Sequence, residues 1–175
     1  GTLEEASAEA DTIETLLSTS DGRDSFFGLW HLVNRVRWLY RIGNVEAGLN
    51  IALEAIPRSE RMADRSLVER LQLLAAEGLG RTGRSSEGAA LLAKAVNGNP
   101  DPPPEMMAEA SRVAGRLVAE SDPDAAAGFF ERASRILQLV GNLAARMDVD
   151  RDAKEMLGLG SNVSIGLDLT TNSTS

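Results

Sequence analysis

The sequence predicts an all-α protein, and three observations support this. Alanine, leucine, glutamate and arginine dominate the composition while β-branched residues are sparse, which favours helices. Apolar residues recur at helical spacing along most of the chain. Tight glycine-containing turns separate these segments at regular intervals, so the helices are expected to form antiparallel pairs. We expect about three such pairs, flanking helices and a non-helical C-terminal tail.

The length, the residue counts and the net charge exclude several classes of protein and of metal site. Its 175 residues fit one domain or one stretch of a repeat array. The absence of cysteine excludes disulfides and thiolate metal sites, and a single histidine, His31, excludes a two-histidine metal site. The net charge of −8 argues against direct nucleic-acid binding. No apolar run is long enough to span a membrane and no secretory signal is present, so we expect a cytoplasmic protein.

The N-terminal third is predicted to form three helices. Residues 2–18 carry one apolar face. Residues 24–42 hold five of the seven aromatic residues of the chain, and Gly43 ends this helix because glycine tolerates the left-handed conformation of a C-cap. A shorter helix is expected to end near Ile56, ahead of Pro57, because proline removes a helical hydrogen bond.

The middle of the chain is predicted to contain three further helices. Ser66-Leu67-Val68-Glu69 has the spacing of a capping box and is expected to begin a helix that runs to about Thr82. A turn follows, and Ser85 begins the next helix. Residues 97–104 are rich in proline, asparagine and glycine and are predicted to form a loop, after which a helix spans about 104–120.

The C-terminal part contains two predicted helices and the tail. Asp122-Pro123 supplies an N-cap and a first-turn proline for a helix that ends near Val140. Residues 143–157 are expected to form the last helix. Its predicted inward residues are Leu143, Met147 and Leu157.

The tail over residues 158–175 has a different pattern. Apolar and polar residues alternate in it, which is the period of a strand rather than of a helix. We interpret it as a linker or tail, and the alternative is a short strand that adds to a neighbouring chain.

The helix pairs recur about every 40 residues and carry small residues at related positions. The strongest unit is residues 69–102, with weaker copies at 29–62 and 107–140. In the unit 69–102, the positions that define the repeat hold Gln72, Ala75, Ala76, Leu79, Gly88, Leu92, Ala95 and Pro100. On these residues the chain resembles the tetratricopeptide repeat (TPR) family. The resemblance implies a TPR-like solenoid over residues 2–157, wound as a right-handed superhelix, with protein binding and no catalysis.

Two motifs resemble chemical sites, and we interpret both as structural. Residues 78–83 spell the glycine pattern of a dinucleotide site and, with Arg84 and Ser85, approach a phosphate-binding loop. That pattern needs a preceding strand, whereas a helix is predicted here, so close helix packing and a turn explain the glycines. The acidic run 148–152 begins like a calcium loop but lacks the required glycine and final glutamate, so we interpret it as a solvated helical face.

Arginines and aromatics gather in residues 23–42, which have a local charge of about +3 in an acidic chain. The resemblance places the first helix of each pair along a concave groove. Arginine forks beside aromatic rings suit a carboxylate-bearing peptide or an acidic helix. The alternative is that the aromatics pack in the core and the arginines are only solvated. The predicted groove residues are Trp30, Arg37, Tyr40, Arg41, Arg70, Glu77 and Arg81.

The expected function is therefore a non-catalytic protein–protein interaction or regulatory module. The resemblance suggests a fragment of a larger bacterial signalling or transcriptional regulator, with a protein or acidic peptide as the partner. We expect no catalytic residues, cofactors or metals. One alternative is a small-molecule sensor that binds its ligand beside the aromatic-rich helix. The other is a self-association module that dimerises through the N-terminal helix or the tail.

Overall fold

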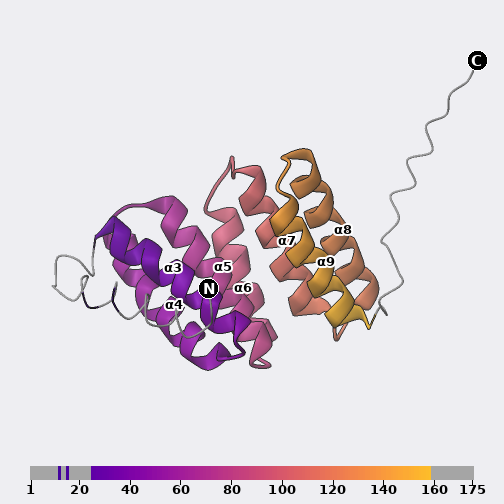
Figure 1. Ribbon diagram of the computed structural model, residues 1–175, viewed down its shortest axis with the longest axis horizontal. Helices are drawn as coiled ribbons and strands as arrows, with labels where there is room; N and C mark the ends of the chain where they lie inside the picture. The colour runs from indigo at the N-terminus through magenta and orange to yellow at the C-terminus, as the bar shows by residue number, and fades with distance from the viewer. Residues whose placement is uncertain (1–11, 13–14, 16–24, 159–175) are drawn as a thin grey trace, which may run out of the picture.

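The computed structural model describes residues 12, 15 and 25–158, and the statements below concern these residues. Over 25–158 the chain forms seven helices and no strand, which confirms the all-α prediction for this part (Figure 1). The predicted helix over 2–18 lies almost wholly outside the described residues, as does the tail after Gly158. The helices are α3 (Phe26–Arg41), α4 (Val45–Arg61), α5 (Arg65–Arg81), α6 (Ser85–Asn97), α7 (Pro104–Val118), α8 (Pro123–Leu139) and α9 (Leu143–Leu157).

Every helix packs against the next one along the chain. In addition, α3 packs against α5, α5 against α7, and α7 against α9. These four helices therefore lie side by side in one layer, with α4, α6 and α8 behind them (Figure 1). The packing brings residues from four separate stretches of sequence onto one shared face.

The turns between helices repeat one hydrogen-bonding pattern. Gly43, Gly83 and Gly141 have φ angles of 83°, 77° and 75°, which glycine adopts without steric cost. In each turn the next residue donates its backbone N–H to a carbonyl five residues earlier in the preceding helix, at 2.8–2.9 Å. The turn between α4 and α5 places Ala63 at a φ of 55°, where a side chain is strained.

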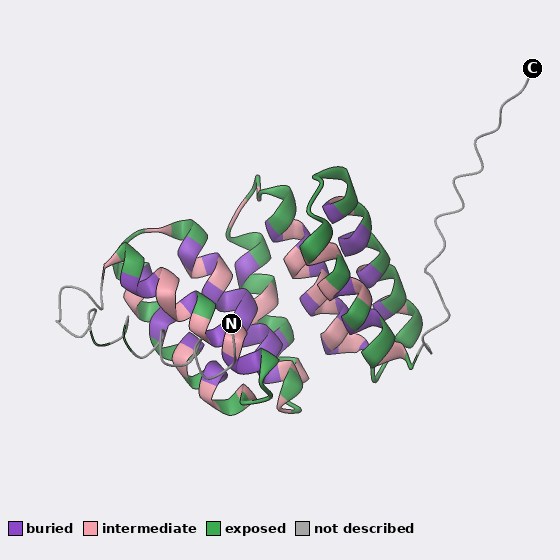
Figure 2. Ribbon diagram, in the orientation of Figure 1, coloured by how far each residue is buried: buried purple, intermediate pink, exposed green. Residues whose placement is uncertain are grey.

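Two main clusters of buried residues form the core, one within α3–α5 and one within α7–α9 (Figure 2). Small residues allow close contacts in both. A Cβ on Gly115 would lie 3.0 Å from the ring of Phe130, the largest fully buried side chain. Leu117 joins the two halves, since its side chain fits against Gly80 and Gly88 of the preceding pair.

Two helix boundaries differ from the sequence predictions. Helix α4 continues through Pro57 to Arg61, and Pro57 lies on the exposed side of the helix, where water can replace the hydrogen bond that proline cannot donate. Helix α5 begins at Arg65 because Asp64 is the N-cap and accepts a 3.0 Å hydrogen bond from the Leu67 N–H. The predicted capping box at 66–69 is therefore wrong.

The orientation of α9 also differs from the prediction. Leu143 and Met147 are 64% and 71% exposed, while Val149 and Ala153 face inward. Leu157, the third predicted inward residue, is partly buried and packs against the cluster of α7–α9, as expected. The last helix packs on α7 and α8 along one side only. By contrast, the predicted start of α8 is confirmed, because Asp122 accepts a 2.9 Å hydrogen bond from the N–H of Ala125.

Within residues 25–158, every helix is too short or too polar to cross a bilayer.

Candidate functional site: a charged cleft on the shared helix face

A cleft of about 510 Å³ opens on the face that α3, α5, α7 and α9 share. Five carboxylates line it, together with apolar residues such as Leu74 and Val149. Six arginines also line it, so positive side chains outnumber negative ones in the cleft, although the net charge of the chain is −8. The six arginines that line it are Arg37, Arg41, Arg70, Arg81, Arg112 and Arg151.

The structure brings six of the seven predicted groove residues to this cleft, and Trp30 is the exception. Trp30 lies beneath Arg70, whose guanidinium carbon is 5.1 Å from the centre of the indole ring. This stacking is a cation–π contact that holds Arg70 at the edge of the cleft. The indole thus supports the groove without lining it.

Tyr40 has a structural role in the wall of the cleft. It is 5% exposed, and its hydroxyl donates a 2.8 Å hydrogen bond to the carbonyl of Leu74 on α5. Its ring fits against Gly48 and Gly78, where a Cβ would overlap it. Burial raises the pKa of Tyr40 and the nearby Glu77 raises it further, so the phenol stays neutral. The alternative in which this aromatic packs in the core is therefore correct for Tyr40.

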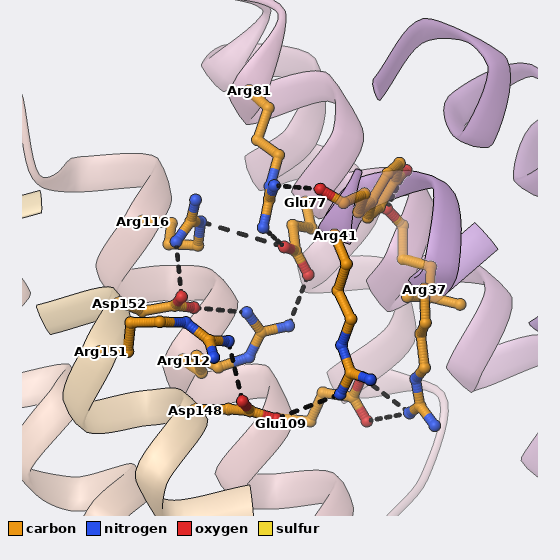
Figure 3. A network of polar contacts seen from close by, with 12 residues as sticks. Arg37, Arg41, Glu77, Arg81, Glu109, Arg112, Arg116, Asp148, Arg151 and Asp152 are labelled. Atoms are coloured by element: carbon orange, nitrogen blue, oxygen red, sulfur yellow. Dashed lines mark hydrogen bonds and ion pairs between the residues drawn. The ribbon is translucent and has the colours of Figure 1, made fainter. Parts of the chain in front are cut away.

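Glu77 is the centre of the buried part of the cleft (Figure 3). One carboxylate oxygen accepts a 2.5 Å hydrogen bond from Arg81 on the same helix, and the other accepts one of 2.5 Å from Arg112 on α7. Burial alone would raise the pKa of Glu77, but the charges of Arg112 and Arg81 and the hydrogen bond from Arg112 lower it to about 2. The carboxylate is therefore ionised and paired across two helices.

Asp152 links the hydrogen-bonded group of Glu77 and its arginines to α9. Arg112 donates a 2.6 Å hydrogen bond to Asp152, and Arg116 lies 3.0 Å from the other Asp152 oxygen. Burial lowers the pKa of Arg112, but Glu77 and Asp152 raise it by a larger amount, so the guanidinium keeps its charge. We call Glu77, Arg81, Arg112, Arg116 and Asp152 the floor network. It joins α5, α7 and α9.

The outer part of the cleft holds its arginines more loosely. Arg37 donates to both oxygens of Glu109 at 3.1 Å. Arg41 and Arg151 have side chains 71% and 64% exposed and share Asp148, at 3.5 and 2.8 Å. Arg70 has its contact with Trp30 but no ion pair among the described residues. We call Arg41, Arg70 and Arg151 the rim arginines, because their guanidinium groups remain available to a ligand.

Sequence reasoning missed the half of the cleft that α7 and α9 supply. On α7 the missed residues are Glu105, Glu109 and Arg112, which recur at helical spacing and could have been found from that spacing. On α9 the acidic run 148–152 was interpreted as a solvated face. That interpretation is wrong for Asp152, which is 4% exposed and paired with two arginines.

The glycine motif at residues 78–83 is a packing feature. It lies at the end of helix α5, with Gly78 against Tyr40, Gly80 against Leu117, and Gly83 in the turn. This agrees with the interpretation made from the sequence. Among the described residues, no group of three or more His, Asp or Glu side chains is placed to hold a metal ion.

A second, apolar groove of about 360 Å³ lies between α6, α7 and α8. Leu92, Met106 and Phe129 contribute to its lining. Arg132 lies at this groove, is exposed, and has no ion pair among the described residues.

The sequence matches no protein-family model and no curated protein. The interpretation of function therefore depends on the cleft and its chemistry.

Proposed function

We propose that this chain is a non-catalytic interaction or regulatory module, a TPR-like solenoid that binds a partner through the cleft on α3, α5, α7 and α9. The helix pairs of the solenoid are α3/α4, α5/α6 and α7/α8, with α9 as a flanking helix. Two observations support this assignment, namely the alternating packing of the helices and the small residues at their crossings. Because such repeats are commonly joined to other domains, a larger cytoplasmic bacterial regulator is the proposed parent protein.

The observation that carries the proposal is the set of rim arginines on a positively charged cleft in an acidic chain. Arginine forks form charge-assisted, bidentate hydrogen bonds with carboxylates. An acidic segment of a partner protein is therefore the ligand that the rim suits best. The negative charge of the rest of the chain would repel such a segment and so direct it to the cleft, whose charge has the opposite sign.

The floor network supports binding rather than catalysis. Glu77 and Asp152 are each paired with arginines, so neither carboxylate is free to act as a base. The low pKa of Glu77 also removes it as a proton donor near neutral pH. The network instead holds α5, α7 and α9 at a fixed spacing beneath the rim.

A labelled oligoglutamate peptide provides the test, with binding followed by fluorescence anisotropy. In the double variant Arg41→Gln/Arg151→Gln the dissociation constant is expected to rise by about tenfold or more, because two charge-assisted hydrogen bonds are lost. The control is Arg61→Gln/Lys154→Gln, which makes the same change in net charge at exposed positions outside the cleft. Equal weakening in both variants would overturn the proposal.

The apolar groove favours a second candidate function, the binding of a small apolar molecule with an anionic group. Its volume is within the usual range for small-molecule sites, and Arg132 supplies a cation beside it that has no ion pair among the described residues. The groove lies away from the aromatic-rich helix, where the sequence placed a ligand. A saturable rise in unfolding temperature with decanoate, abolished by Ala93→Phe in the groove, would favour this function over the first.

A further inference from the structure

The floor network contains more positive than negative charge. Arg81, Arg112 and Arg116 contact only two carboxylates, those of Glu77 and Asp152, among the described residues. The carboxylates are 3% and 5% exposed at their side chains, and Arg116 is 7% exposed. One positive charge is therefore left without a counter-charge in a largely buried setting, where an unpaired charge costs most.

The wider network does not supply the missing negative charge (Figure 3). The Arg37 pair with Glu109 is neutral, and Asp148 is shared by Arg41 and Arg151. The ion pairs of the cleft thus join six arginines to four carboxylates. Arg70 and Glu105 also line the cleft, and with them the count is seven arginines and five carboxylates. The excess of positive charge grows when the outer part of the cleft is included.

Within the floor network, Arg116 is the arginine with buried nitrogens that make no hydrogen bond to a described residue. Its Nε and Nη1 atoms are buried and have no hydrogen-bond partner within the described part of the chain. Nη1 lies 3.0 Å from Asp152 and Nε lies 4.0 Å from Glu77, so both contacts are ion pairs without the geometry of a hydrogen bond. By contrast, Arg112 donates to both carboxylates, and Arg81 donates to Glu77 and to the carbonyl of Tyr40.

The chemistry of arginine defines what can complete this site. A guanidinium has donors only and does not lose its proton in proteins, so the missing partner must be an acceptor. Water could accept the hydrogen bonds but would leave the charge uncompensated. A small anion does both. Arg116 itself lies behind the lining of the cleft, but Glu77 and Asp152, the two carboxylates beside it, line the cleft directly.

We propose that Arg116 and the floor network bind one small monovalent anion, either chloride or a single carboxylate group. This inference does not rest on the proposed partner, because the rim arginines and the floor network are separate groups of residues. The bound anion would neutralise the floor and strengthen the junction between α5, α7 and α9.

The test uses chloride as the probe and the broadening of the ³⁵Cl NMR signal as the readout. The wild-type chain is expected to broaden the signal saturably, and Arg116→Met is expected to reduce that broadening by about tenfold, because it leaves two cations on two carboxylates. Arg61→Met is the matched control, since Arg61 is exposed and lies outside the cleft. Absent broadening, or equal broadening in wild type and Arg116→Met, would mean that only water occupies the site and would overturn the proposal.

Competition with acetate identifies the source of the anion. Displacement of chloride by acetate assigns the site to a carboxylate, and retention of chloride assigns it to an inorganic anion.

If Arg116→Met fails to fold, anomalous diffraction from wild-type crystals in bromide replaces the comparison. A bromide peak at the Arg116 guanidinium supports the proposal, and its absence there overturns it. Loss of oligoglutamate binding in Arg41→Gln/Arg151→Gln with chloride binding retained would show that the two sites are independent.

Discussion

Glu77 shows how one buried side chain can connect several helices. It accepts hydrogen bonds from α5 and α7, and through Arg112 it is linked to Asp152 on α9. Replacing such a pair with apolar residues is often neutral, but removing one partner leaves the other charges buried and unpaired. The consequence is that Glu77 is expected to be sensitive to substitution.

The substitution Glu77→Gln is expected to reduce the free energy of unfolding by about 3–5 kcal/mol. Urea titration of the wild type and the variant measures the difference. Glu87→Gln is the control, because Glu87 forms an exposed pair with Arg84 and its loss is expected to leave stability unchanged. Equal stability of wild type and Glu77→Gln would contradict the importance of the floor network.

The ion pairs of Glu77 with Arg81 and Arg112 also determine how the stability of the fold depends on pH. The pKa of Glu77 is about 2 in the folded chain, against an ordinary value of 4.5. A lowered folded pKa contributes stability that is complete above the unfolded pKa and is lost as the pH falls towards the folded pKa. The stability difference between wild type and Glu77→Gln is therefore expected to be constant above pH 4.5 and to shrink between pH 4.5 and 2. A difference that stays constant through this window would contradict the ionised pair.

The turns give a second residue-scale prediction. Gly83→Ala is expected to reduce the free energy of unfolding by about 1 kcal/mol, because the alanine would adopt a positive φ although no atom lies near its Cβ. Ala63→Gly should act in the opposite direction by about 0.5 kcal/mol, since Ala63 already has this strained φ. Thermal unfolding of both variants measures the two shifts, and shifts of the same sign would contradict the strain argument.

At the scale of helices, local sequence patterns predicted most elements but not their exact ends. The turns at Gly43, Gly83 and Gly141 follow from local backbone chemistry and were predictable. The continuation of α4 through Pro57 was not, because it depends on which side of the helix faces solvent. The inward face of α9 was also unpredictable, since Leu143 and Met147 have the apolar spacing of a core but lie on the side that no described helix covers.

Close packing of helices makes a prediction that separates two kinds of glycine. Gly78→Ala is expected to cost about 1–3 kcal/mol, because its Cβ would overlap the Tyr40 hydroxyl and approach Leu49 to 3.1 Å. Gly128→Ala is the matched control within α8, where no atom lies within 4 Å, and it is expected to stabilise the chain by about 0.5–1 kcal/mol. Chemical denaturation measures both changes. Stabilisation by Gly78→Ala would contradict the close helix crossing.

At the scale of the whole molecule, the cleft depends on contacts between distant parts of the sequence. Six of the seven predicted groove residues line it because α3 and α5 have a regular helical register. The contributions of α7 and α9 were missed because pairs such as Arg41 with Asp148 join residues 107 positions apart. Local periodicity gives the face of one helix, but it does not say which charges on two helices will meet.

The alternating packing of the helices is what brings the charged residues of separate helices into one cleft. Each of the helices α3, α5, α7 and α9 contributes one or two arginines to the cleft, and no single helix pair could form the cleft alone. A truncation that removes α9 is expected to remove Asp148 and Asp152 together and so to disturb both the rim and the floor network.

We propose that the charged cleft is the surface that binds a partner. Mapping of backbone amide shifts by ¹⁵N–¹H NMR during titration with oligoglutamate locates the bound peptide. Saturable shifts are expected on the cleft faces of α3, α5, α7 and α9, reduced by the double variant Arg41→Gln/Arg151→Gln and weakened by salt. Shifts centred instead on α4, α6 and α8, or no saturable shifts at all, would contradict the proposal.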